Sequence, residues 1–232
     1  MPIFSHAPDI WAEFPDLTAC ALTIDGVTAT ADVTRHLDHF SAEAARRLEG
    51  TSEGDLPEIQ AWRRSFSKMG LKPTQYRCAS EALLRRFKKE GSLPQIHPLI
   101  DLCNAISIAF AIPIAVFDRD RIDGDLLVRR AVGDEHYLTF GGEVEQPESG
   151  EVIFVDAQNN AHARRWTNRQ SATSAIRPET TRALIVAEAQ HENGAGDIAR
   201  LHATLVDTLT AVWPLAGRST LLSADAARVS ID

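Results

Sequence analysis

Two polar side chains, Asn104 and Ser107, interrupt the apolar stretch HPLIDLCNAIS at residues 97–107. The spacing of the apolar residues predicts a helix over residues 97–110. One face of this helix carries Ile100, Cys103, Asn104 and Ser107. Because the rest of the helix is also apolar, it should be buried. The Asn104 amide is then either satisfied by a neighbouring backbone group or directed into a pocket.

Glu188 is a second polar residue in an apolar setting. It lies near the end of ETTRALIVAEA at residues 179–189, which predicts a buried strand because it is continuously apolar from Ala183 to Ala187. An ionised carboxylate beside apolar side chains is costly unless a partner compensates it. Glu188 therefore lies either in water, where the strand ends, or in a site that provides such a partner.

Basic residues are concentrated in two segments of a chain whose net charge is −8. Residues 61–91 hold nine basic and two acidic side chains, interleaved with Phe66, Tyr76 and Phe87. The second segment is RRWTNRQ at residues 164–170. Guanidinium groups beside aromatic rings suit phosphates and nucleic-acid bases. The alternatives are solvated helix faces in the first segment and, in the second, a surface turn anchored by Trp166.

Several common active-site chemistries are excluded because the chain lacks GxxxxGK[ST], GxGxxG after a strand, HExxH and GxSxG. The three cysteines, Cys20, Cys78 and Cys103, are too far apart for a CxxC motif, and we expect reduced core thiols. His36 and His39 lie three residues apart on a predicted helix, but no third ligand follows at a recognisable spacing. We therefore expect no metal and no cofactor.

The order of elements predicts an α+β fold. A strand at residues 17–27 precedes helices at 32–48, 57–69, 80–91 and 97–110, then short strands with tight turns, and a final amphipathic helix within 197–213. There is no apolar run of 18 residues, and the start MPIFSHAPDIWAEF lacks the pattern of a secretory signal. We expect a soluble, cytoplasmic protein that does not enter membranes. The sequence leaves its oligomeric state open.

The segments WRRSFSKMGLKPTQYRCASEALLRRFKKEGSLPQIHPLIDLCNAISIAFAIPIAVFD, GEVIFVD, RRWTNRQ and TTRALIVAEA together resemble the free-standing B3/B4 domain proteins. The most specific part of the resemblance is an ordered series made of Pro94, Asp101, Asn104, Pro113 and Asp118. These proteins are similar to the editing domain of the phenylalanyl-tRNA synthetase beta chain. The resemblance implies a central, mostly antiparallel sheet flanked by helices. The resemblance covers roughly residues 62–189, and we expect residues 57–214 to form the B3/B4-like domain, with residues 1–56 packed on it as a strand and helix and residues 215–232 as a tail.

The resemblance further implies a pocket for the aminoacyl end of tRNA, in which the ester of a wrong amino acid is hydrolysed. Asn104 and Glu188 match the catalytic positions. The expected substrate pocket comprises Cys103, Ser107, Pro113, Ala115, Asn168, Arg169 and Thr181. The expected RNA contacts are Arg77, Arg85, Arg86, Lys88, Lys89, Arg164, Arg165 and Trp166, with Trp166 and Arg169 at the terminal adenosine.

Two functions follow as hypotheses from this resemblance. The first is trans-editing: deacylation of mischarged aminoacyl-tRNA by a stand-alone enzyme. The second is a non-catalytic module that binds tRNA or an amino acid after losing hydrolysis, and it is motivated by Ala115, which stands where the family pattern has a histidine. In both, the partner is tRNA or aminoacyl-tRNA, and no DNA binding is expected.

Overall fold

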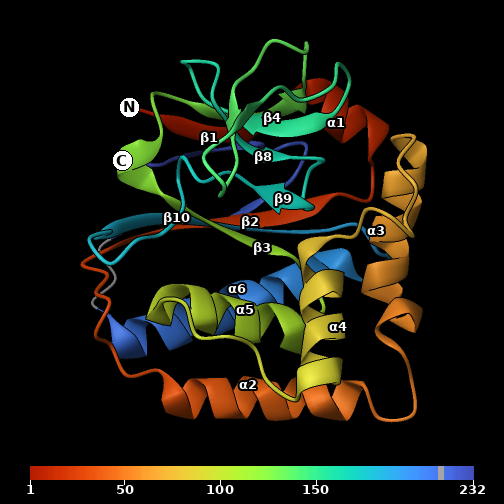
Figure 1. The fold of residues 1–232 in the computed structure, drawn as a ribbon, viewed down its shortest axis with the longest axis vertical. Coiled ribbons are helices and arrows are strands. Elements are labelled where there is room, and N and C mark those ends of the chain that lie inside the picture. Colours follow the sequence, from red (N-terminus) through yellow and green to blue (C-terminus); the bar gives the residue numbers. More distant parts are fainter. Residues whose placement is uncertain (214–216) are drawn as a thin grey trace.

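The computed structural model describes residues 1–213 and 217–232, which form four layers. A six-stranded sheet lies on a four-stranded sheet, helices α5 and α6 cover the far face of the second sheet, and α2 lies beneath these helices (Figure 1). Helices α3 and α4 flank one side of the layers. The predicted α+β class with mostly antiparallel strands is confirmed, and the strands are divided between two main sheets.

The six-stranded sheet has the order β12–β1–β4–β7–β8–β9. Its strands are β1 (Ile3–His6), β4 (Leu126–Arg130), β7 (Val152–Val155), β8 (Ala161–Arg164), β9 (Arg169–Gln170) and β12 (Arg228–Ser230). Within the described part of the chain, β1 and β4 are the parallel neighbours in this sheet, and its other neighbours are antiparallel. The two ends of the chain thus lie side by side in adjacent strands, β1 and β12 (Figure 1).

The four-stranded sheet has the order β11–β2–β10–β3 and is antiparallel throughout. Its strands are β2 (Thr18–Asp25), β3 (Ile114–Asp118), β10 (Arg182–Ala189) and β11 (Ser219–Leu222). Side chains alternate between the two faces of a strand. Leu184 and Val186 therefore face the six-stranded sheet, whereas Ala183, Ile185 and Ala187 face α5 and α6. Glu188 has the parity of Val186 and lies on the face toward the other sheet.

The six α-helices of the described residues are α1 (Pro8–Glu13), α2 (Thr34–Arg47), α3 (Pro57–Lys68), α4 (Ala79–Glu90), α5 (Pro98–Phe110) and α6 (Gly194–Val212). Helix α5 begins where the His97 Nδ1 atom accepts a hydrogen bond from the Leu99 backbone N–H at 3.2 Å, and proline occupies its first turn. None of the helices in the described ranges combines the length and apolar composition needed to cross a membrane.

Two cores hold the layers together. The first lies between the two sheets and includes Phe4, Phe154, Phe117 and Trp166, with side chains from α1, α3 and α4. The second lies between the four-stranded sheet and helices α2, α5 and α6. The four-stranded sheet therefore separates the part of the molecule built around α5 from the part that contains Glu188.

The segments at both ends of the chain contribute to both sheets. Residues 1–56 supply β1 and β2 together with α1 and α2, and residues 217–232 supply β11 and β12. The part of the predicted tail that the structure describes, residues 217–232, contains two strands: β11 pairs with β2, and β12 pairs with β1. Residues 215 and 216, also assigned to that tail, lie outside the described residues.

Candidate aminoacyl-binding cavity

A buried carboxylate is the centre of the candidate site. Glu188 on β10 is only 2% exposed. Its Oε1 atom lies 2.9 Å from the indole Nε1 of Trp166 and 2.6 Å from the imidazole Nε2 of His6. A carboxylate can only accept, so both ring nitrogens donate to this one oxygen. These two hydrogen bonds supply the compensation that a buried carboxylate needs.

Trp166 is positioned by the hairpin that joins β8 to β9. Arg165 and Trp166 have φ values of +48° and +57°, a left-handed conformation that is uncommon outside glycine. The Trp166 backbone N–H donates to the Val152 carbonyl at 2.7 Å. Its ring packs edge-on against Trp62 and Phe14, with centroid distances of 5.2 Å and 4.8 Å. Packing thus holds a strained turn that aims the indole N–H at Glu188.

His6 is positioned by the last residue pairing of β1. It pairs with Val128 on β4, and the next backbone N–H, of Ala7, donates to the Val128 carbonyl at 2.9 Å. The His6 side chain is fully buried and stacks at a tilt on Trp11, 4.9 Å between centroids. Its Nδ1 atom has no hydrogen-bond partner within the described chain. The imidazole is therefore held by its contacts to Glu188 and Trp11.

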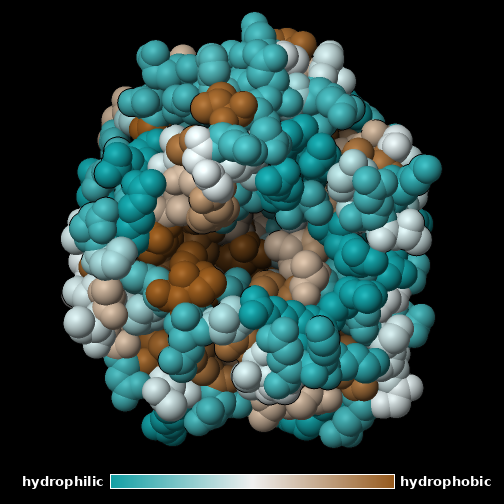
Figure 2. Space-filling model, in the orientation of Figure 1, coloured by the Kyte–Doolittle hydropathy of each residue, from teal (hydrophilic) through white to brown (hydrophobic). Residues whose placement is uncertain are grey.

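Beside this carboxylate lies a cavity of about 60 Å³, the inner cavity. It is lined by Ala79, Pro113, Ile114, Ala115, Phe154, Ala163, Trp166, Thr167, Asn168, Arg169, Gln170, Val186 and Glu188. Figure 2 shows an apolar hollow in the middle of this face, where Figure 1 places β3 and β9. Within the described residues no group donates to Oε2 of Glu188, so that oxygen remains available to a ligand. The Thr167 hydroxyl is likewise without a partner.

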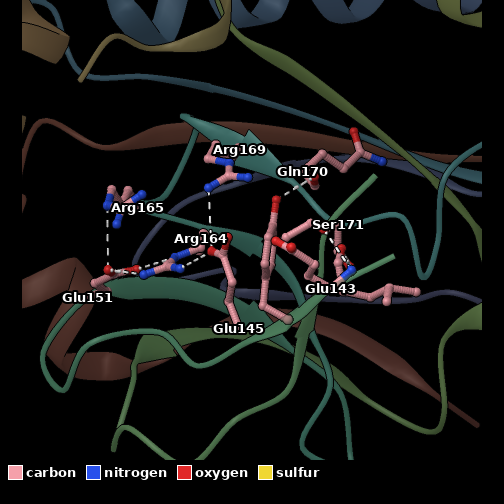
Figure 3. Close-up of polar contacts among 11 residues, drawn as sticks. Glu143, Glu145, Glu151, Arg164, Arg165, Arg169, Gln170 and Ser171 are labelled. Atoms are coloured by element: carbon pink, nitrogen blue, oxygen red, sulfur yellow. Dashed lines mark hydrogen bonds and ion pairs between the residues drawn. The ribbon is translucent and has the colours of Figure 1, made fainter. Parts of the chain in front are cut away.

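A second, wider cavity of about 470 Å³, the outer cavity, adjoins the first. Its lining residues are Tyr137, Thr139, Phe140, Gly141, Glu143, Glu145, Arg169 and Gln170. The two cavities share Arg169 and Gln170. Figure 3 shows Arg169 directed at Glu145, 3.4 Å from its Oε2 atom, and the same oxygen accepts from Arg164 at 2.6 Å. The Arg169 guanidinium also lies 5.4 Å from the Tyr137 ring centroid.

Of the residues predicted for catalysis and the substrate pocket, the structure brings five together at the inner cavity: Pro113, Ala115, Asn168, Arg169 and Glu188. The others lie elsewhere. Asn104 is half-buried on α5, on the opposite side of the four-stranded sheet, and is not among the cavity-lining residues. Thr181 is exposed just before β10, seven positions along the chain from Glu188.

Cys103 and Ser107 belong to the second core rather than to a cavity wall. Burial raises the pKa of the Cys103 thiol to about 12, which keeps it protonated at neutral pH. The Ser107 hydroxyl donates to the Ile112 carbonyl at 2.6 Å and so closes the C-terminal end of α5. The polar group of Ser107 is therefore satisfied by a backbone carbonyl and is not directed into a pocket.

The residues predicted to contact RNA divide into two groups. Trp166 is 0% exposed, so it cannot stack on a base: its polar neighbour is Glu188. Arg164 is buried and its guanidinium pairs with Glu145 and Glu151 at 2.6 Å (Figure 3), which leaves it unable to meet phosphates. Arg165 lies beside Glu151, 3.5 Å away. The basic segment at residues 164–170 is thus a turn anchored in the core.

The basic face of α4 is exposed but partly neutralised. Arg85 pairs with Glu53 at 3.2 Å and Arg86 with Glu90 at 2.9 Å. Arg77, just before α4, lies 3.3 Å from Glu81. Lys88 and Lys89 are exposed and pair with no carboxylate of the described residues. An exposed ion pair is weak and opens readily to a competing phosphate, so this face stays available.

One group of side chains has the composition of a metal site. Glu58, His191 and Asp197 each place a ligand atom within 4.8 Å of the others. Arg47 already pairs with Glu58 at 2.7 Å and Arg200 with Asp197 at 2.5 Å. Both carboxylates also lie in first turns of helices, where the helix dipole disfavours cations. The group is therefore an ion-pair network, and it lies outside both cavities.

The sequence alone gave no role to His6. Its segment, IFSH, is only four residues long and alternates in burial, with Phe4 and His6 facing inward. The residue types of this segment do not alternate between apolar and polar, so the sequence carries no signal for the buried face or for the contact to a carboxylate 182 positions away.

Comparison with known proteins assigns the family. The model of the B3/4 domain matches residues 61–204, more than half of the 232 residues. The chain belongs to the B3/4 domain family, as its motifs predicted. His6 lies outside the matched range, whereas Trp166 and Glu188 lie within it.

Among solved structures, the chain is similar to the crystal structure of an N-terminal fragment of the phenylalanyl-tRNA synthetase beta-subunit from Pyrococcus horikoshii. The two are 12% identical with a TM-score of 0.48, and the match covers 93% of this chain and 49% of that one. This chain thus spans about half the length of that fragment. No curated protein matches it.

Proposed function

We propose that this protein binds tRNA in the cytoplasm and acts in trans as an editing hydrolase that deacylates mischarged aminoacyl-tRNA. Membership of the B3/4 family supports the proposal. The observation that carries it is the Glu188 carboxylate, which two donors hold through Oε1 while Oε2 remains without a partner beside a cavity.

The chemistry required of such an enzyme is modest. An aminoacyl ester is already activated, so the protein has to hold it, position one water and stabilise the oxyanion that forms. Oε2 of Glu188 is suited to accept from the substrate α-ammonium or from the attacking water. Two groups of the cavity lining are suited to donate hydrogen bonds to this oxyanion. They are the Thr167 hydroxyl, which has no partner within the described residues, and the Arg169 guanidinium.

Asn104 has a different part in this proposal from the one that the family resemblance implies. Because it is not among the cavity-lining residues, the proposal assigns it no contact with the ester and leaves Glu188 as the carboxylate on which hydrolysis depends. Changing Asn104 to Ala should therefore leave ester hydrolysis within about threefold of wild type, in contrast to changes at Glu188.

The volume of the inner cavity favours a small amino acid. A cavity of about 60 Å³ holds only a few water molecules. Ligand pockets of drug-sized molecules are several times larger. A side chain of the size of alanine or serine fits this space, whereas an aromatic one does not. The proposed substrate is accordingly tRNA carrying a small amino acid on the wrong acceptor.

The test is a deacylation panel. Purified protein is incubated with tRNAs charged with glycine, alanine, serine, phenylalanine and tyrosine, and ester loss is followed against buffer. We expect faster loss of a small aminoacyl group, and a reduction of about 100-fold in Glu188→Ala. Glu192→Gln, which removes an exposed carboxylate just after β10, is the matched control. A panel in which no ester is lost faster than in buffer contradicts the proposal.

A second function, binding without hydrolysis, is favoured by one observation. The inner cavity is lined by Ala115 where the family pattern has a histidine, and its titratable residues are Glu188 and Arg169. A binding module would retain tRNA in a filter or anisotropy assay at low salt, with affinity falling as salt rises, yet accelerate no ester loss. Accelerated ester loss that disappears in Glu188→Ala while tRNA binding persists excludes this alternative.

A further inference from the structure

Glu188 is buried without a lysine or arginine to pair with. Within the described residues its partners are the ring N–H groups of His6 and Trp166. Arg169 also lines the inner cavity, but its guanidinium is directed at Glu145 instead (Figure 3). A buried negative charge is costly, and a positive charge brought by a ligand compensates it further. The chemistry of Glu188 therefore favours a ligand that carries a cation.

Two side-chain amides, those of Asn168 and Gln170, line the same cavity. The Asn168 Nδ2 atom donates to the Arg77 carbonyl at 2.8 Å, and the Gln170 Nε2 atom donates to the Val116 carbonyl at 2.6 Å. Because a carbonyl can only accept, these contacts decide which end of each amide is the nitrogen. Within the described part of the chain, neither amide oxygen accepts a hydrogen bond. Each amide is thus held by its nitrogen and keeps its oxygen as a free acceptor.

Gln170 is held at a point where the two main sheets meet. It lies on β9, the last strand of the six-stranded sheet, and its bond to Val116 reaches β3, the last strand of the other sheet. The Tyr137 hydroxyl donates to the Gln170 carbonyl at 2.7 Å. Tyr137 belongs to β5 (Tyr137–Leu138), which pairs with β6 (Val144–Glu145). The Gln170 amide is therefore preorganised, which lowers the entropy lost when a ligand binds.

The side chains that line the inner cavity offer three free acceptor oxygens: Oε2 of Glu188, Oδ1 of Asn168 and Oε1 of Gln170. A primary ammonium has three N–H donors and a positive charge. A hydroxyl has one donor and no charge, and an acylated amino group has one donor, no charge and a larger volume. In a cavity of about 60 Å³ the ammonium is the group that matches both the acceptors and the space.

We propose that Asn168 and Gln170, together with Glu188, bind the α-ammonium of the substrate and restrict the inner cavity to esters whose amino group is free. This inference rests on the proposed function, because it takes an aminoacyl group to be the ligand. It makes Gln170 a specificity-determining residue, a role for which the sequence gave no signal. Esters of α-hydroxy acids and of N-acylated amino acids, peptidyl-tRNA among them, are excluded as substrates.

The experiment compares two ligands of nearly equal size and needs no hydrolysis. They are 3′-alanylamino-3′-deoxyadenosine and its lactyl analogue, in which a hydroxyl replaces the amino group. Isothermal titration calorimetry measures their binding to the wild type, Gln170→Met and Asn168→Ala. Gln60→Met is the matched control, because Gln60 is also half-buried and its amide donates to the Gly54 carbonyl outside both cavities. Circular dichroism verifies that each variant is folded.

We expect the wild type to bind the alanyl ligand about tenfold more tightly than the lactyl ligand, because bonds from a charged donor are the stronger ones. Gln170→Met and Asn168→Ala should each lower this preference about threefold, whereas Gln60→Met should preserve it. The inference is overturned if the wild type binds both ligands alike or binds neither. It is also overturned if the two cavity variants weaken both ligands equally, which is the result that a merely structural role gives.

The outcomes separate this inference from the proposed function. A protein that prefers the alanyl ligand but hydrolyses no aminoacyl-tRNA supports the inference and contradicts the editing proposal. A protein that deacylates aminoacyl-tRNA but binds the alanyl and lactyl ligands alike overturns the inference alone.

Discussion

The Nε2 atom of His6 lies 2.6 Å from Oε1 of Glu188, although 182 positions of sequence separate the two residues. The first strand of the chain thus completes the surroundings of a carboxylate on β10, an inner strand of the other sheet. Because both side chains are almost fully buried, the contact is made away from water, where an unpaired charge is most costly. The segment before the matched B3/4 range is therefore part of the candidate site.

Changing His6 to Ala should lower the free energy of unfolding by about 2 kcal/mol, because Glu188 loses one of its two donors in a buried setting. His6→Gln, whose amide can donate from a similar position, should recover part of this loss. His136→Ala, which removes an exposed imidazole, is the control. Urea denaturation measures the difference, and equal midpoints for His6→Ala and His136→Ala would contradict the role given to His6.

Trp166→Phe retains most of the ring that packs on Trp62 and Phe14 but removes the indole N–H that Glu188 accepts. We expect a loss of about 1 kcal/mol in stability and a larger loss of ester hydrolysis, because Oε1 is no longer held in place. Trp213→Phe removes a comparable indole bond, to the Thr28 hydroxyl at 3.2 Å, outside both cavities. It should change stability to a similar extent and hydrolysis little. Similar hydrolysis rates in the two variants would be evidence against the account.

Ala115→Val should block the inner cavity. Ala115 pairs with Val186 across the sheet and lines a space of about 60 Å³, and a β-branched residue is well accepted in a strand. We expect binding of tRNA to persist while ester hydrolysis falls at least tenfold. Thr181→Val, which introduces the same β-branched side chain at an exposed position just before β10, should leave both unchanged. If the Ala115→Val variant hydrolyses the ester at the wild-type rate, the inner cavity is not the site of ester hydrolysis.

Asp156 should govern the acid sensitivity of the fold. Although burial acts to raise the pKa of Asp156, hydrogen bonds from His162 and Asn160 outweigh it and lower the pKa to about 2. An unfolded aspartate has a pKa of about 4, so the ionised group stabilises the fold above pH 4, and this contribution is lost as the pH falls toward 2.

Asp156→Asn should therefore be less stable than wild type above pH 4, and the difference should shrink as the pH falls from about 4 to 2. Asp38→Asn, which changes an exposed aspartate outside any ion pair of the described residues, should follow the wild type at every pH. Thermal unfolding followed across this pH range measures both. A difference between Asp156→Asn and wild type that is independent of pH would refute the assignment.

Helices α2 to α6 and the long strands could be predicted because their signals are local, whereas α1, a helix of only 6 residues, was not predicted. Proline at residue 57 and glycine after residue 90 mark helix ends, and the apolar run of β10 identifies a buried strand. Strands β1, β6, β8, β9, β11 and β12 were not predicted. Each has only two to four residues, and β1, β11 and β12 pair with distant segments of the chain, so local pattern carries little information about them.

The candidate site, like the fold, was predictable only where the signal is local. Glu188 was identifiable because a carboxylate follows an apolar run, but its donors come from β1 and from the β8–β9 turn. Periodicity placed Asn104 on one face of α5. It could not show that the four-stranded sheet lies between α5 and the Glu188 side chain. From composition alone, Trp166 was equally suited to contact a base or to anchor the turn in the core. The structure shows that Trp166 is buried, in a turn with left-handed backbone conformation that no sequence pattern indicated.

The claim that Glu188 and the inner cavity receive the aminoacyl end of tRNA is tested most directly by locating a stable substrate mimic. The mimic is 3′-alanylamino-3′-deoxyadenosine, in which an amide replaces the ester, and the measurement is ¹H–¹⁵N NMR of the four tryptophan indoles. We expect the Trp166 indole signal to shift on titration and Glu188→Ala to abolish saturable binding. A mimic that binds while the Trp166 signal stays unchanged would contradict it.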